Sequence, residues 1–118
     1  MARILIVDDE VHVREVLADA VIADGHDVEQ ADDGSTALAM LRAGSAPDLL
    51  ITDGCMPKVN GIELARQARR LGVPKILMIT ATEDEEFQEV ARAAGVDRIL
   101  MKPVDMSDLS RTVAELLQ

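Results

Sequence analysis

The feature that most constrains this chain is an alternation, repeated five times, between short apolar runs and longer amphipathic stretches. Nearly continuous apolar runs are typical of strands covered on both faces in a parallel sheet. Four such runs cover Ile4–Val7, Leu49–Ile51, Lys75–Ile79 and Ile99–Met101. A fifth run, Asp27–Gln30, holds one apolar residue, Val28, and is therefore expected at an edge of the sheet.

Apolar residues between these runs recur at steps of three and four, which predicts helices with one apolar face each. The predicted faces are Val13, Val16, Leu17, Ala20 and Val21; Ala37, Leu38 and Leu41; Leu64, Ala65, Ala68 and Leu71; Phe87, Val90, Ala91 and Ala94; and Met106, Leu109, Val113 and Leu116. Gly25, Gly44, Gly72 and Gly95 follow these stretches, where a left-handed C-cap is easiest for glycine. Asp105 or Ser107 is expected to cap the last helix.

The alternation predicts one α/β domain over residues 1–118. Its sheet would be a doubly wound, five-stranded parallel (βα)5 sheet with right-handed crossovers and the flavodoxin-like strand order 2-1-3-4-5. In open sheets of this kind, ligands bind beyond the carboxyl ends of the strands, where the strand order reverses.

Composition excludes several classes of partner. The net charge of −10 would repel nucleic acid and anionic membrane surfaces, and Phe87 is the only aromatic residue that could stack on a base. Cys55 is the only cysteine, so no internal disulfide can form. No apolar run approaches the roughly 20 residues of a membrane helix, and the start does not read as a signal peptide. We expect a soluble, cytoplasmic protein.

Polar side chains stand at the ends of four of the five predicted strands. Asp8 and Asp9 follow the first strand, Asp53 the third, Thr80 the fourth and Lys102 the fifth. Two carboxylates about 4 Å apart repel by about 4 kcal/mol at an effective dielectric constant of 20, so three of them require a cation. Carboxylate oxygens suit Mg²⁺, which binds proteins through one or two carboxylates and keeps waters for a phosphate oxygen. The sequence therefore predicts a magnesium site.

A carboxylate beside such a metal can act as a nucleophile and form an aspartyl phosphate. Asp53 is the expected acceptor, with Lys102 and Thr80 placed to hold the phosphoryl oxygens. Each residue also has an ordinary interpretation when taken alone: Asp8 and Asp9 as helix caps, Thr80 as a strand-end cap, and Lys102 as a solvated lysine. The combination favours phosphoryl chemistry.

These motifs resemble the receiver domain of two-component response regulators, including stand-alone regulators of the chemotaxis type. VDDE matches its acidic pair, ITDGCMPKVNG its phosphoacceptor loop, MITAT its hydroxyl strand and LMKP its lysine followed by proline. The resemblance runs from Arg3 to Leu117, with five functional positions in order at the family's spacing.

The resemblance implies that Asp53 takes a phosphoryl group from a histidine kinase, a phosphotransfer protein or a small phosphodonor. Asp9 and Asp53 would ligate Mg²⁺ directly, with the main-chain carbonyl of Cys55 as a third ligand and Asp8 acting mainly through water. The Lys102-Pro103 bond is expected to be cis.

The resemblance also implies a signalling switch that catalyses only its own phosphorylation and dephosphorylation and thereby controls binding to a downstream target protein. We expect a monomer or a weak phosphorylation-dependent dimer. A start at Met1 and the absence of a linker favour a stand-alone regulator over a part of a longer one.

Two positions depart from the family pattern. Many members carry Tyr or Phe three residues before the lysine, as a ring that turns inward when the threonine moves, and here that residue is Ile99. The side chains at the positions of Cys55 and Thr82 influence phosphoryl lifetime in the family. Residues 83–86 form an acidic run that is either a solvated first helical turn or a surface that faces a partner.

Three other functions stay open at this stage. A Mg²⁺-dependent aspartyl phosphatase or phosphotransferase acting on a small molecule would have an acid two residues after the nucleophile, where this chain has Cys55. A flavin-binding module would need a phosphate loop after the first strand, where Asp8 and Asp9 would repel phosphate. A receiver-like module that only binds partners is favoured by Ile99 and opposed by the intact acids, Thr80 and Lys102.

Overall fold

The computed structural model describes residues 1–56 and 59–118, and the predicted alternation of strands and helices is confirmed. Pro57 and Lys58, which belong to the ITDGCMPKVNG motif, lie outside the described residues. The strands are β1 (Arg3–Val7), β2 (Asp27–Ala31), β3 (Leu49–Asp53), β4 (Ile76–Thr80) and β5 (Arg98–Met101). The helices are α1 (Val11–Ala23), α2 (Gly34–Ala43), α3 (Gly61–Arg70), α4 (Glu85–Ala94) and α5 (Met106–Leu116).

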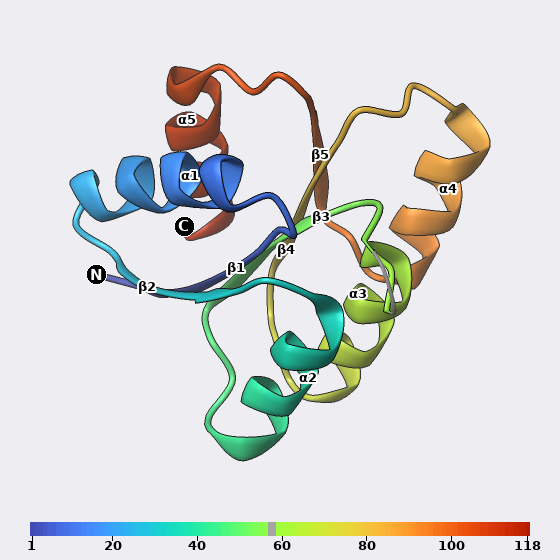
Figure 1. The fold of residues 1–118 in the computed structure, drawn as a ribbon, viewed down its shortest axis with the longest axis horizontal. Helices are drawn as coiled ribbons and strands as arrows, with labels where there is room; N and C mark the ends of the chain where they lie inside the picture. Colours follow the sequence, from blue (N-terminus) through green and yellow to red (C-terminus); the bar gives the residue numbers. More distant parts are fainter. Residues whose placement is uncertain (57–58) are drawn as a thin grey trace.

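All strand pairs are parallel, and the order β2-β1-β3-β4-β5 confirms the predicted doubly wound sheet. Figure 1 shows α1 and α5 together on one face of the sheet and α2, α3 and α4 on the other. The strand order reverses between β1 and β3, so the carboxyl ends of these two strands lie side by side. This is where a ligand site is expected in such a sheet.

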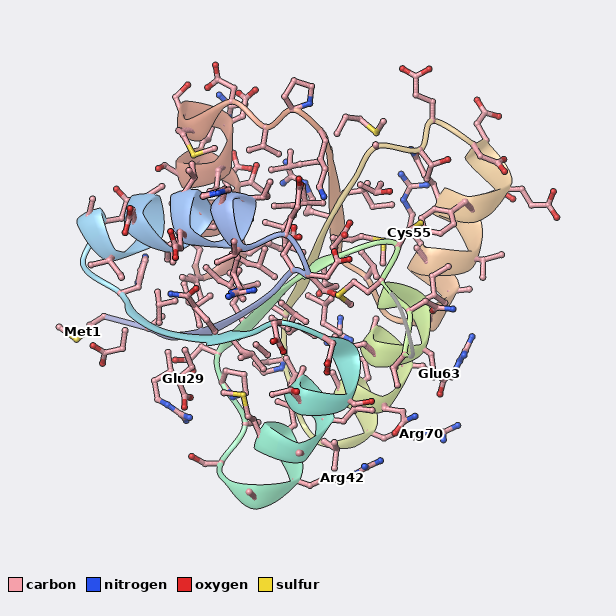
Figure 2. The ribbon with its side chains drawn as sticks, viewed as in Figure 1. Met1, Glu29, Arg42, Cys55, Glu63 and Arg70 are labelled. Atoms are coloured by element: carbon pink, nitrogen blue, oxygen red, sulfur yellow. The ribbon has the colours of Figure 1, made fainter. Side chains whose placement is uncertain are left out.

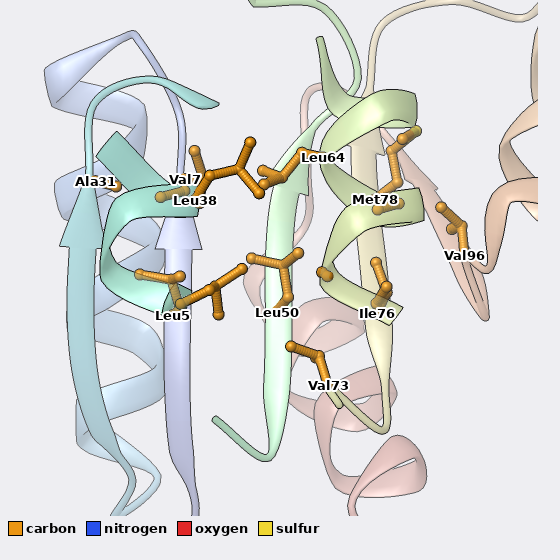
Figure 3. Close-up of a cluster of buried hydrophobic side chains, with 14 of the residues drawn as sticks. Leu5, Val7, Ala31, Leu38, Leu50, Leu64, Val73, Ile76, Met78 and Val96 are labelled. Atoms are coloured by element: carbon orange, nitrogen blue, oxygen red, sulfur yellow. The ribbon is translucent and has the colours of Figure 1, made fainter. Parts of the chain in front are cut away.

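Alternation along each central strand supplies a core to both faces, because successive side chains point to opposite sides of a sheet. Leu5, Leu50 and Met78 pack toward α2 and α3, as Figure 3 shows, while Ile6 and Ile51 pack toward α1 and α5. The edge strand β2 buries only Ala31, in agreement with its poor apolar content.

The loops that carry the site are anchored by capped helix starts. Asn60 accepts a hydrogen bond from the Glu63 amide (2.9 Å) at the start of α3, and Asp84 accepts one from the Glu86 amide (3.0 Å) at the start of α4. Asp105 caps α5 by accepting from the Ser107 amide at 2.8 Å, which confirms one of the two predicted caps. Each such bond satisfies an amide that the helix itself leaves unpaired.

Four details of the predicted helices were wrong. Gly44 ends α2 in extended backbone (φ −136°), not in the left-handed conformation that Gly25, Gly72 and Gly95 adopt. Three residues of the predicted apolar faces are exposed: Val16 (52%), Leu71 (37%) and Val90 (44%).

No helix in the described ranges combines the length and apolar character needed to cross a membrane.

Candidate functional site

The ends of β1 and β3 bring three carboxylates together. Asp53 is the last residue of β3, and Asp8 and Asp9 directly follow β1. One carboxylate oxygen from each of the three lies within 4.8 Å of the other two. Asp8 and Asp53 are buried, whereas Asp9 is exposed. The three acids therefore converge from two strands, as the sequence predicted.

Lys102 reaches this cluster from β5, on the far side of β4. Its Nζ lies 3.3 Å from Asp53 Oδ1 and 3.4 Å from Asp8 Oδ2. The Lys102 amide donates to the Thr80 carbonyl (2.9 Å), which fixes the lysine beside the end of β4. The Lys102-Pro103 peptide bond is cis, as predicted.

The electrostatics of the site follow from this arrangement. Burial raises the pKa of the Asp53 carboxyl, and the neighbouring Asp8 charge raises it further, while the Lys102 ammonium acts in the opposite direction. Burial works against the charge on Lys102, but the carboxylates of Asp53 and Asp8 outweigh burial and raise the pKa of this lysine. The ammonium therefore stays charged, and the buried acids are only partly compensated.

Two hydrogen bonds, one from a backbone amide and one from a side chain, hold Asp8 in place. The Glu10 amide donates to Asp8 Oδ1 (2.8 Å), and Arg14 Nη1 donates to the Asp8 carbonyl (2.8 Å). The capping residue of α1 is Glu10, which makes no side-chain capping bond, so Asp8 and Asp9 are not the caps of this helix. Sequence reasoning missed Arg14; its place on the first turn of α1, after the acidic run, was the available signal.

The start of α3 lies directly against the end of β3. The Gly61 amide donates to the Gly54 carbonyl (3.3 Å), which joins the first residue of α3 to the residue after Asp53. A methyl group on Gly61 would overlap the Asp53 carbonyl oxygen. Figure 2 shows Cys55 on the loop between β3 and α3, and its thiol is free and exposed. The Cys55 amide lies 3.5 Å from Asp53 Oδ1, a long contact.

Thr80 ends β4 and is buried next to the acceptor loop. Its hydroxyl oxygen accepts a hydrogen bond from the Thr82 amide (3.3 Å). Ile99 on β5 is half-buried against the core beneath α3 and α4, so the position of the usual ring holds ordinary apolar packing.

The sequence matches a known protein family over most of its length. The family model described as "Response regulator receiver domain" matches residues 4–114. The chain belongs to this family. The receiver domain is 38% identical over 117 residues to "Response regulator MprA" of Mycobacterium avium, covering 98% of this chain and 51% of that relative. It thus spans about half the length of the relatives of this kind.

Solved receiver structures share its fold closely. The chemotaxis protein CheY4 of Vibrio cholerae superposes with a TM-score of 0.92 at 31% identity, covering 99% of both chains. The receiver domain of the putative response regulator NarL from Mycobacterium tuberculosis gives 0.88 at 27% identity, covering 98% of this chain and 95% of that one. This receiver domain is a component of two-component signalling.

Proposed function

We propose that this receiver domain accepts a phosphoryl group on Asp53 in a Mg²⁺-dependent reaction, with a histidine kinase or a phosphotransfer protein as donor. The observation that carries the proposal is the position of Lys102 Nζ, 3.3 Å from Asp53 and 3.4 Å from Asp8, beside the third carboxylate of Asp9. The lysine after β5 and the two acids after β1 then surround the buried carboxylate of Asp53 at the carboxyl edge of the sheet.

The donor set fits magnesium. Asp8, Asp9 and Asp53 offer hard oxygen ligands within 4.8 Å of one another, and the Cys55 main-chain carbonyl is the fourth oxygen that we assign to the site. When bound, Mg²⁺ neutralises charge on the phosphoryl oxygens as they approach the acids. Burial and the Asp8 charge raise the pKa of Asp53 in spite of Lys102, so a second cation at this place would favour the charged carboxylate.

The transfer step uses Asp53 as the nucleophile and a phosphohistidine of the donor protein as the phosphoryl source. An Asp53 carboxylate oxygen attacks phosphorus, the P–N bond of the donor phosphohistidine breaks, and its electron pair remains on the imidazole nitrogen, which takes up a proton from solvent. Lys102 pairs with one phosphoryl oxygen, and the Thr80 hydroxyl donates to another. Burial strips water from Asp53 and so strengthens these electrostatic interactions.

The phosphorylated receiver would then change its affinity for a downstream protein, and external substrates play no part. We include in the proposal a monomer or a weak phosphorylation-dependent dimer. We also include a cytoplasmic location, where reducing conditions keep a single thiol such as Cys55 free.

The test is a mass measurement on the intact protein after incubation with acetyl phosphate and Mg²⁺. We expect one base-labile phosphoryl adduct, lost in Asp53→Asn and lost when the metal is chelated. Asp19→Asn, an exposed aspartate on α1, is the matched control and should be labelled like the wild type. An undiminished adduct in Asp53→Asn would place the acceptor elsewhere.

A further inference from the structure

Gly54, Thr80 and Phe87 border one small volume next to the acceptor Asp53. Gly54 directly follows Asp53 and is buried. A methyl carbon on Gly54 would lie 2.8 Å from Thr80 Oγ1, 2.9 Å from Thr80 Cβ and 3.2 Å from Phe87 Cζ. The hydroxyl of Thr80 and the tip of the Phe87 ring therefore border the same small volume.

Position 54 requires glycine because a side chain would not fit, and not because the backbone adopts a positive φ. The glycines with positive φ are Gly25, Gly72 and Gly95, and Gly54 is not one of them. Any side chain at position 54 would occupy the volume that Thr80 and Phe87 now border. Its Cβ atom would lie closer to Thr80 than the 3.0 Å below which real Cβ contacts essentially never occur. The absence of a side chain at this position thus lets a residue of α4 approach the acceptor loop.

Thr80 is also tied to the start of α4 by a chain of hydrogen bonds. The Thr82 amide donates to Thr80 Oγ1 (3.3 Å), and the Asp84 amide donates to Thr82 Oγ1 (3.2 Å). Asp84 in turn caps α4, and Gln88 Nε2 on the second turn donates to the Thr82 carbonyl (3.4 Å). Thr80 is therefore connected to the first two turns of α4 by hydrogen bonds, and it borders the same small volume beside Gly54 as the tip of the Phe87 ring.

We propose that Phe87 is a positioning residue for Thr80, and that its ring carries the movement of Thr80 to α4. This inference rests on the proposed function, in which the Thr80 hydroxyl turns to a phosphoryl oxygen on Asp53. That turn withdraws the acceptor from the Thr82 amide and empties the volume beside Gly54. Because protein interiors are close-packed, the neighbouring ring moves into the vacated space and takes the first turns of α4 with it.

Phe87 suits this role better than the residue on β5. Ile99 is half-buried against the same core as Phe87, but it has no ring and no hydroxyl to exchange positions with Thr80. Phe87 is the only aromatic side chain in the chain, and it packs on that core from α4 while its ring tip reaches the acceptor loop.

The single aromatic residue makes a direct test available. Phenylalanine replaced throughout by 4-fluorophenylalanine labels Phe87 alone, so the ¹⁹F spectrum reports one site. We expect the resonance to shift when acetyl phosphate and Mg²⁺ phosphorylate the protein, with occupancy measured by intact mass on the same sample. The shift should be lost in Thr80→Val compared at equal occupancy, because this variant keeps the volume and loses the hydroxyl.

The outcomes separate the two proposals. A wild-type protein that gains no phosphoryl mass overturns the proposed function and this inference with it. A phosphorylated protein with an unmoved ¹⁹F resonance overturns the inference alone, and so does a shift that persists in Thr80→Val.

A second measurement follows amide hydrogen exchange in the first two turns of α4. At equal phosphoryl occupancy, Phe87→Leu should lose the difference in exchange between phosphorylated and unphosphorylated protein. Ile99→Val, which trims a half-buried residue of the same core, is the matched control and should keep the difference. Equal loss in both variants, or no loss in Phe87→Leu, would overturn the assignment to Phe87.

Discussion

Replacing Lys102 with methionine should destabilise the metal-free protein through one identifiable interaction. Methionine keeps a long apolar stem but removes the ammonium, so the buried carboxylates of Asp8 and Asp53 are left facing each other without their cation. Leaving a buried charge unpaired is strongly unfavourable. The same substitution in an Asp53→Asn background removes the ammonium when one of its two carboxylates is already gone, and should therefore cost less.

The magnitude follows from the distance. Unit charges separated by the 3.3 Å between Lys102 Nζ and Asp53 Oδ1 attract by about 5 kcal/mol at an effective dielectric constant of 20, and by about 1.3 kcal/mol in bulk water. The lysine side chain is 24% exposed, so solvent screens part of this attraction. We expect a coupling free energy of about 2–3 kcal/mol between the two positions, which for a chain of this length corresponds to about 8–12 °C in melting temperature.

The assay is a double-mutant cycle. Unfolding free energies are measured by urea titration in the presence of a chelator for wild type, Lys102→Met, Asp53→Asn and the double variant. Lys75→Met, which removes a half-buried lysine from the loop before β4, is the matched control and should show no coupling to Asp53→Asn. Saturating Mg²⁺ should reduce the penalty of Lys102→Met, because the metal supplies the missing positive charge.

A coupling below about 0.5 kcal/mol, which is the additivity limit for independent sites, would refute this reasoning. It would mean that Lys102 is effectively solvated and does not compensate the buried acids. A negative coupling would refute it as well, since the ion pair would then oppose folding.

Three further predictions concern the same edge of the sheet. Folding raises the pKa of Asp53. Metal-free wild type should therefore lose stability as the pH rises from the ordinary aspartate pKa of 3.8 through the higher pKa of the folded protein, and Asp53→Asn should lack this loss. Parallel curves of stability against pH for the two proteins would contradict this prediction. Mg²⁺ at tenfold excess over its dissociation constant should stabilise the wild type by about 1.4 kcal/mol, whereas Asp9→Asn should gain markedly less at the same concentration, as measured by thermal denaturation. Gly61→Ala should lower the unfolding free energy by about 1–3 kcal/mol and slow phosphorylation, since its methyl group overlaps the Asp53 carbonyl oxygen. Gly95→Ala, which is strained by its positive φ and meets the Arg69 side chain at the end of α4, should be destabilised without the same loss of phosphorylation rate.

The predicted fold depended on patterns that are local in the sequence. Apolar runs such as Leu49–Ile51 are strands because both faces of a parallel sheet are buried, and helical steps of three and four place Leu64 and Ala68 on one face. The edge position of β2 was predictable because the run Asp27–Gln30 has a single apolar residue, Val28. The extended backbone at Gly44 and the exposure of Val16 were not predictable, since they depend on neighbours that no short window contains.

The sequence by itself determined which residue types stand at each strand end, and therefore that acids, a hydroxyl and a lysine meet at the edge where the sheet reverses. Only the tertiary structure decided the distances: Lys102 lies 94 residues from Asp8 along the chain yet 3.4 Å away in space. It also placed the Phe87 ring tip and Thr80 around the same small volume beside Gly54, an arrangement without any signature in the local sequence. The physical reason is that hydrophobic periodicity specifies which face of each element is buried, whereas packing of all ten elements together sets how closely their side chains approach.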